Sequence, residues 1–142
     1  MPTRIDNLGV WCFVILLSIN LRADEDFANA LKLLNSPNSE QYNKGLRIIK
    51  ELGDKDNPKA LLAFADLHLE GRIVKINKKK AFELTERAAK LNLPEALNNL
   101  GVFHEKGIGT AIDLPLAYES YSKSSKLLFI PAIYNTAVCY ER

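Results

Sequence analysis

The chain has 142 residues, of which 47% are apolar and 25% are charged, a balance typical of globular proteins and too apolar for a disordered chain. Its 19 basic and 17 acidic residues leave a net charge of +2, which is too small to suggest a nucleic-acid or anionic-lipid surface. Two cysteines cannot form a disulfide framework. The composition therefore predicts a soluble globular protein without a nucleic-acid partner.

Residues 1–23 differ in composition from the rest of the chain. A basic start with Arg4 leads into an uncharged apolar run from Leu8 to Ile19, and Ala23 precedes an acidic segment. This order predicts a secretory signal peptide over residues 1–23, cleaved after Ala23, and no membrane contact after cleavage. An uncleaved anchor and a buried helix are the alternatives, although a bilayer-spanning helix needs about 20 apolar residues. We expect a secreted or periplasmic protein, or one in the endoplasmic reticulum lumen of a eukaryote.

The rest of the chain contains an internal repeat with a period of 36 residues. Pro-Lys-Ala-Leu at Pro58 recurs as Pro-Glu-Ala-Leu at Pro94 and, with Ile in place of Pro, at Ile130. His68 and His104 are separated by the same offset. Repeats of this length are typical of stacked helix pairs. The predicted organisation is a divergent N-terminal capping repeat (24–57), two repeats (58–93 and 94–129) and the first helix of a truncated repeat (130–142).

Each unit is predicted to contain two helices. In the capping repeat these cover residues 24–35 and 42–52, where Gly45 stands at the position of Ala81. In the next repeat, apolar residues at helical spacing predict a first helix over 59–70 and a second over 78–91.

Residues with special backbone roles mark the ends of these helices. Gly71 is predicted to end a first helix, because a C-terminal glycine can take a positive φ. Asn77 and Asp113 are predicted to cap the second helices with their side chains. The second repeat has Gly107 and Gly109 in its turn.

The segments from Ala96 to Gly109 and from Asp113 to Tyr121 resemble the Sel-one-like repeat, a relative of the tetratricopeptide repeat. The resemblance covers about residues 40–142. It departs from the family pattern where His68 and His104 replace a tyrosine, where Ile73 replaces a second turn glycine, and where Ser124-Ser125 replaces a pair of alanines. It implies an all-α, right-handed solenoid of antiparallel helix pairs, a non-catalytic scaffold that binds a protein or peptide, and a bacterial, secreted member of the family.

In such solenoids the first helix of each pair usually lines the concave surface, so residues off its core stripe are candidates for partner binding. Leu62 and Val138 have an alternative role, which is to pack into the next unit. The predicted partner-binding residues are Leu62, Asp66, Leu69, Asn98, Val102, Glu105, Tyr134 and Val138.

Catalysis is the alternative class of function. Ser120 and Lys123 fit the S-x-x-K pattern of penicillin-interacting and β-lactamase-type hydrolases, some of which resemble this family. The serine is predicted to lie in the middle of a helix, and neither a Ser-Asp-Asn nor a Lys-Thr-Gly element accompanies it. We therefore predict no enzyme, and an adaptor in lumenal protein quality control is a third interpretation.

Histidines and lysines supply the remaining candidates. His68 and His104 are predicted to pack in place of the family tyrosine, because a metal needs three or four ligands and no Cys, Asp or Glu cluster repeats beside them. A metal-ligand or pH-sensing role for these histidines is the alternative. Lys75 and the run 78–80 are predicted to form a solvated turn, with a docking patch for an acidic partner as the alternative. No metal or cofactor is expected.

Overall fold

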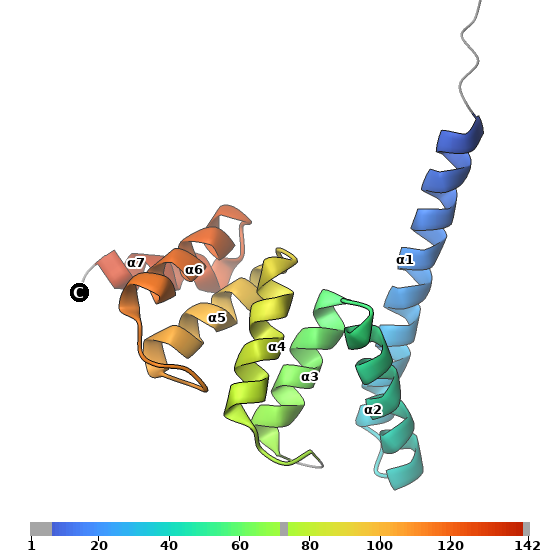
Figure 1. The fold of residues 1–142 in the computed structure, drawn as a ribbon, viewed down its shortest axis with the longest axis horizontal. Coiled ribbons are helices and arrows are strands. Elements are labelled where there is room, and N and C mark those ends of the chain that lie inside the picture. Colours follow the sequence, from blue (N-terminus) through green and yellow to red (C-terminus); the bar gives the residue numbers. More distant parts are fainter. Residues whose placement is uncertain (1–6, 72–73, 141–142) are drawn as a thin grey trace, which may run out of the picture. The chain divides into compact units, whose positions relative to one another are not determined.

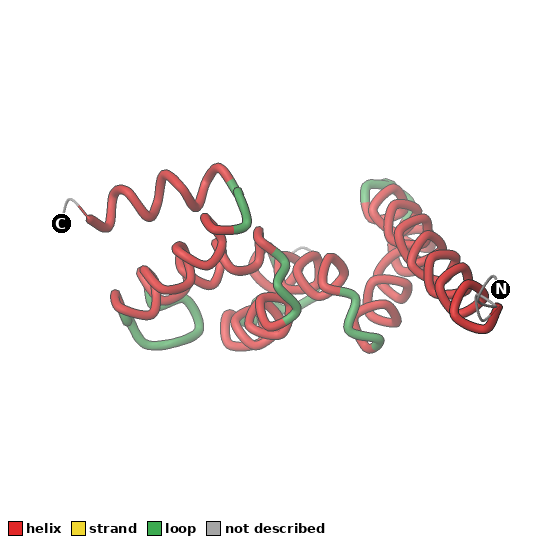
Figure 2. Tube along the Cα trace, turned by 90° about the horizontal axis from the view of Figure 1, so that it is seen from above, coloured by secondary structure: helices red, strands yellow, loops and turns green. Residues whose placement is uncertain are grey.

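The structure is a computed structural model that describes residues 7–71 and 74–140. Within these residues the chain forms seven α-helices and no β-strand, and loops connect the helices (Figures 1 and 2). The helices are α1 (Asn7–Leu34), α2 (Ser39–Asp54), α3 (Pro58–Glu70), α4 (Lys78–Lys90), α5 (Pro94–Lys106), α6 (Leu114–Lys126) and α7 (Ile130–Tyr140). The predicted all-α fold is confirmed.

From α3 onward the helices follow the predicted period. The starts of α3, α5 and α7 lie at Pro58, Pro94 and Ile130, and those of α4 and α6 lie at Lys78 and Leu114, so equivalent helices begin 36 residues apart. The observed bounds of α3 and α4 agree with the predicted helices to within one residue. Apolar spacing, which selects one buried face, was sufficient to place both.

The ends of these helices carry the predicted caps. The side-chain oxygens of Asn77 and Asp113 each accept a hydrogen bond of 2.9 Å from the backbone amide three residues later. Gly71 and Gly107 follow α3 and α5 with φ angles of 68° and 66°, and each amide donates to a carbonyl of the last helical turn. Local side-chain chemistry therefore determines where the helices stop.

Neighbouring helices pack in the order of the chain. Contacts join α3 to α4, α4 to α5, α5 to α6 and α6 to α7. A core cluster that includes Leu61, Leu84, Leu97 and Phe103 spans α3, α4 and α5. Burial of each such side chain contributes about 1.5–3 kcal/mol. Alanines allow the helix backbones to approach closely, and those of α3 to α7 that are at most 1% exposed are Ala60, Ala65, Ala81, Ala88, Ala96, Ala117 and Ala132.

The chain divides into two compact units, residues 1–48 and 49–142, and each is described by itself. In the first unit, α2 approaches α1 at Gly45. A Cβ atom at Gly45 would lie 2.9 Å from the carbonyl oxygen of Ala30 and 2.9 Å from Cβ of Leu33. Glycine is therefore needed at this helix contact for steric reasons.

Helix α1 is longer than the predicted helix over 24–35, because it begins at Asn7. It continues without a break through Ala23, the predicted cleavage residue, while the basic start with Arg4 lies outside the described residues. Among the residues that the structure describes, no helix combines the length and the apolar character needed to cross a bilayer. Helix α2 also exceeds its predicted range of 42–52 at both ends.

Candidate functional site

The predicted partner-binding residues lie on the first helices α3, α5 and α7. Because these helices repeat every 36 residues, the candidates fall into three sets of equivalent positions, which we call columns. The first column contains Leu62, Asn98 and Tyr134; the second contains Asp66, Val102 and Val138; the third contains Leu69 and Glu105. These residues are predicted to form one surface, which we call the first-helix face.

Exposure changes strongly along the first column. Leu62 is only 5% exposed and belongs to the core cluster, whereas Tyr134 is 70% exposed. The expectation that Leu62 faces a partner is therefore corrected: its side chain belongs to the core cluster that α3 shares with α4 and with α5 of the next repeat. Packing into the next unit was the alternative role for this residue. Tyr134 offers a large aromatic surface to solvent.

Asn98 is also buried, at 8% exposure, so the expectation that it faces a partner is corrected as well. The residue instead connects two first helices. Its Oδ1 accepts a hydrogen bond of 2.9 Å from Nδ2 of Asn135 in α7. Sequence reasoning did not select Asn135. The available signal was its position, because it directly follows the candidate Tyr134 in a first helix. Because this amide pair is partly buried, its bond orients α7 against α5.

The second column contains the most strongly perturbed carboxylate of the described residues. Partial burial raises the pKa of Asp66 from 3.8 to about 6, and the negative charges of Glu95 and Glu70 add to the increase. The Asp66 residue still contacts solvent. Val102 and Val138, at the equivalent positions, are half-buried. An ammonium or guanidinium group of a partner would relieve the repulsion among these carboxylates.

The third column is fixed by contacts with the second helices and the core. Leu69 is half-buried and packs against the core cluster. Glu105 accepts a hydrogen bond of 2.8 Å from the hydroxyl of Tyr121 in α6, whose ring is completely buried. The Glu105 carboxylate therefore has a defined position at the edge of the first-helix face.

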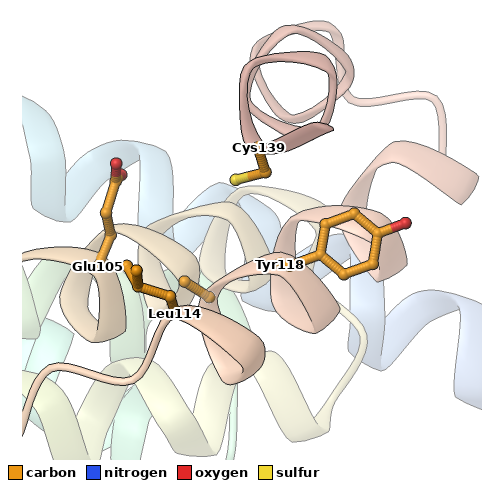
Figure 3. A pocket seen from close by; sticks show the side chains of 5 residues that line it. Glu105, Leu114, Tyr118 and Cys139 are labelled. Carbon is orange, nitrogen blue, oxygen red and sulfur yellow. The ribbon is translucent and has the colours of Figure 1, made fainter. Parts of the chain in front are cut away.

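A pocket of about 120 Å³ lies beside Glu105, between α6 and the helices α5 and α7. Its other lining residues are Leu114, Ala117, Tyr118 and Cys139 (Figure 3). The thiol of Cys139 points from α7 toward the side of the pocket where Glu105 and Leu114 lie, and Tyr118 lies on the other side. Sequence reasoning did not predict this pocket.

Both histidines pack against phenylalanine rings. The ring centroids of His68 and Phe64 are 4.9 Å apart, and the His104 ring meets Phe82 edge-on at 5.4 Å. Within the described ranges, no group of three or more His, Cys, Asp or Glu residues is arranged to hold a metal ion. The position of Ile73, where the family has a second turn glycine, lies outside those ranges.

The S-x-x-K residues are engaged in contacts within their own helix. The Ser120 hydroxyl donates a hydrogen bond of 2.8 Å to the carbonyl oxygen of Leu116. Lys123 forms an ion pair of 2.7 Å with Glu119, and this hydrogen-bonded contact lowers the pKa of the Glu119 carboxyl. Ser120 is buried in the middle of α6, and the hydroxyl of Ser120 and the ammonium group of Lys123 each contact another group of this helix.

The lysine run 78–80 forms the first turn of α4, and Lys75 lies in the segment before this helix. All four lysines are solvent-exposed. Lys80 lies 3.6 Å from Glu83 across one turn of this helix, and both side chains are about half exposed. Such exposed pairs contribute little stability. The run 78–80 is therefore helical and not a turn, because the Asn77 cap starts the helix immediately before it. Its side chains are solvated as expected, and the docking patch stays a prediction.

The fold, with its face of equivalent first-helix positions, places this protein in the class of solenoids built from antiparallel helix pairs. The family model of the Sel1 repeat matches residues 55–93 and 94–127. The chain belongs to the Sel1 repeat family, whose members are typically protein-interaction scaffolds.

Comparisons with individual proteins agree with this assignment. Over 84 residues the chain is 33% identical to Activator of C kinase protein 1 of Saccharomyces cerevisiae, a stretch that covers 56% of this chain and 14% of that relative. It thus spans a small part of the relative's length.

Two solved structures have similar folds. A Sel1 repeat protein from Oxalobacter formigenes is 27% identical, with a TM-score of 0.69 over 86% of this chain and 96% of that chain. The cysteine rich protein B of Helicobacter pylori is 21% identical, with a TM-score of 0.68 over 82% of this chain and 90% of that chain. The second likeness concerns the fold alone.

Proposed function

We propose that this chain is a non-catalytic scaffold that binds another protein or peptide through the first-helix face, on the side expected to be concave. The observation that carries the proposal is the fixed orientation of groups on this face. The bond from Tyr121 holds the Glu105 carboxylate before any partner arrives, and the bond from Asn135 to the buried Asn98 holds α7, which presents the exposed ring of Tyr134, against α5. Preorganised groups lose less conformational entropy on binding, and therefore favour affinity.

The exposed residues indicate the chemistry of the partner. Asp66, together with Glu70 and Glu95, supplies negative charge, and Tyr134 supplies an exposed aromatic ring. Aromatic side chains are frequent energetic centres of protein interfaces. A partner segment with basic and apolar side chains would complement both features.

The test replaces the two most accessible groups of the face, in the double variant Asp66→Lys/Tyr134→Ala. The matched control, Glu83→Lys/Leu128→Ala, makes the same charge change and also truncates an exposed apolar side chain, but at positions outside the first helices. A partner captured by the wild type is identified by mass spectrometry, purified, and titrated against each variant.

We expect the face variant to bind this partner at least about tenfold more weakly, which corresponds to about 1.4 kcal/mol. The control should bind like the wild type, and all three proteins should have the same helical circular dichroism. Equal affinity of the face variant and the wild type would reject the first-helix face. Hydrolysis of a chromogenic β-lactam that Ser120→Ala abolishes would reject the non-catalytic role.

We also propose that residues 1–23 act as a cleaved signal that directs the protein to a secreted, periplasmic or lumenal compartment. Support comes from the apolar side chains of α1 that are more than half exposed, namely Leu16, Leu17, Ile19 and Leu21. A run of exposed apolar side chains is typical of a segment that binds another apolar surface, as a signal peptide does. Mass spectrometry of the protein from its native cell should find Asp24 as the first residue, and an intact N-terminal segment would contradict cleavage.

A further inference from the structure

Cys139 occupies a position that is part of the core in the preceding repeats. Its equivalents at the 36-residue offset are Leu67 and Phe103, and both are buried. The Phe103 ring stacks on Phe82 of the preceding second helix, with 6.3 Å between the ring centroids. In that repeat, a phenyl ring fills the space between a second helix and the first helix that follows it.

The same space is open one repeat later. The equivalents of Phe82 and Phe103 are Tyr118 in α6 and Cys139 in α7, and both line the pocket of about 120 Å³ (Figure 3). A thiol is much smaller than a phenyl ring, so this substitution removes the side chain that would otherwise fill the space. The pocket is therefore an unfilled copy of the Phe103 site.

The walls and the size of the pocket suit an aromatic ring. Leu114, Ala117 and the ring of Tyr118 provide apolar surface, and the Glu105 carboxylate lies at the edge. An apolar cavity of about 150 Å³ in another protein is known to bind benzene. Leu114 is 58% exposed, so the pocket borders a surface that a ligand can reach.

We propose that this pocket binds the phenyl ring of a phenylalanine in a partner peptide, against Tyr118, as Phe103 lies against Phe82. That the occupant is a peptide rests on the proposed protein-binding function. That the pocket binds an aromatic ring does not depend on that function. The preceding repeat carries the argument, because it shows which side chain the same helix geometry accommodates.

The first experiment uses toluene as a probe and follows backbone amides of the whole chain by two-dimensional NMR. Toluene should shift the amide signals of Leu114, Tyr118 and Cys139. The variant Cys139→Phe fills the pocket with its own ring, and should bind toluene at least about tenfold more weakly while melting at a higher temperature. Cys139→Ala leaves the pocket open and should retain toluene binding.

If Cys139→Phe does not fold, Cys139→Leu replaces it, because leucine occupies the equivalent position 67. Toluene shifts that lie elsewhere, or that persist unchanged in the filled variant, would overturn the pocket. Leu128→Ala, at an exposed position that does not line the pocket, should bind like the wild type and serves as the control.

The second experiment identifies the occupant by selection from a random heptapeptide library. Peptides that bind the wild type should contain phenylalanine, compete with toluene, and lose at least about tenfold in affinity when that phenylalanine becomes alanine. Toluene binding without such peptides would overturn the peptide occupant. A wild type that does not bind toluene would reject this pocket and leave the first-helix face untouched. Partner binding that is insensitive to Asp66→Lys/Tyr134→Ala would reject only the first-helix face.

Discussion

Gly101 in α5 lies directly against the ring of Tyr121 in α6, and a Cβ atom at Gly101 would lie 2.5 Å from Cε1 of that ring. The ring is completely buried and its hydroxyl is bonded to Glu105, so it has little freedom to move. In the preceding repeat the equivalent pair is Ala65 and Thr85. Across this helix contact, the larger side chain of Tyr121 is thus accompanied by a smaller residue, Gly101, on the opposite helix.

This relationship predicts that Gly101→Ala lowers the free energy of unfolding by about 1–2 kcal/mol. Overpacking costs about 1–3 kcal/mol, while the better helix propensity of alanine returns up to about 1 kcal/mol. Urea denaturation of the wild type and the variant measures the difference.

A double-mutant cycle provides the control for the Gly101 prediction. In a Tyr121→Thr background the ring is absent, so Gly101→Ala should become neutral or stabilising by up to about 1 kcal/mol. The same loss in both backgrounds would show that steric conflict with Tyr121 is not the cause.

Gly109 has a stricter requirement than Gly107. Both have positive φ, of 71° and 66° respectively, but a Cβ at Gly109 would overlap the backbone carbonyl of Lys78, whereas at Gly107 it would meet a side-chain atom of Ile112 at 3.0 Å. A side chain can move and a helix backbone cannot move as easily. Gly107→Ala should lower the free energy of unfolding by about 1 kcal/mol because of its strained φ. We expect Gly109→Ala to lower it by more. Thermal unfolding of both variants would contradict this if their order were reversed.

The raised pKa of Asp66 predicts a dependence of stability on pH. The folded protein holds this proton up to about pH 6, whereas the unfolded chain releases it near 3.8. The folded state therefore binds more protons between these values, and the Asp66 contribution to stability falls as pH rises through this window. Since the residue contacts solvent, we expect the effect to be about 0.5–1 kcal/mol.

The variant Asp66→Asn isolates this effect. At pH 7 it should be more stable than the wild type, and the difference should decrease as pH falls from 7 to 4. Glu83→Gln, outside this group of carboxylates, serves as the matched control in denaturant titrations at each pH. A difference between Asp66→Asn and the wild type that does not change with pH would contradict the assignment.

The Asp113 cap gives a prediction about local helix stability. Asp113→Ala removes the acceptor for the amide of Leu116 and should cost about 1 kcal/mol. Asp113→Ser retains an acceptor at the same place and should lose much less. Hydrogen exchange at the start of α6 checks whether the loss is local, because fraying should increase there and not in α4.

Features with a local cause were predictable from the sequence. The caps at Asn77 and Asp113 and the ends at Gly71 and Gly107 follow from single side chains and their backbone angles. The period of 36 residues predicted helix pairs because one pair cannot bury its own apolar face. The sequence alone therefore placed the helices at 59–70 and 78–91 to within one residue.

The leading helices were less predictable. The predicted bounds of the first helix, 24–35, were wrong at the N-terminal end, because residues 1–23 differ in composition from the rest and yet α1 runs through Ala23 without a break. Helix propensity does not change at a cleavage site. The start of the helix and the end of the predicted signal therefore fall at different residues. Helix α2 extends beyond its predicted ends because flanking polar residues add turns that apolar spacing does not mark.

The sequence by itself determined the period, the order of first and second helices, and their caps, because these depend on contacts within a few residues. Only the tertiary structure decided that Leu62 and Asn98 are buried while Tyr134 is exposed, although all three occupy equivalent positions. Burial depends on which helices cover a residue and on how large their side chains are. The same reason explains the pocket at Cys139, which exists only where a small side chain meets helices spaced to accommodate a ring.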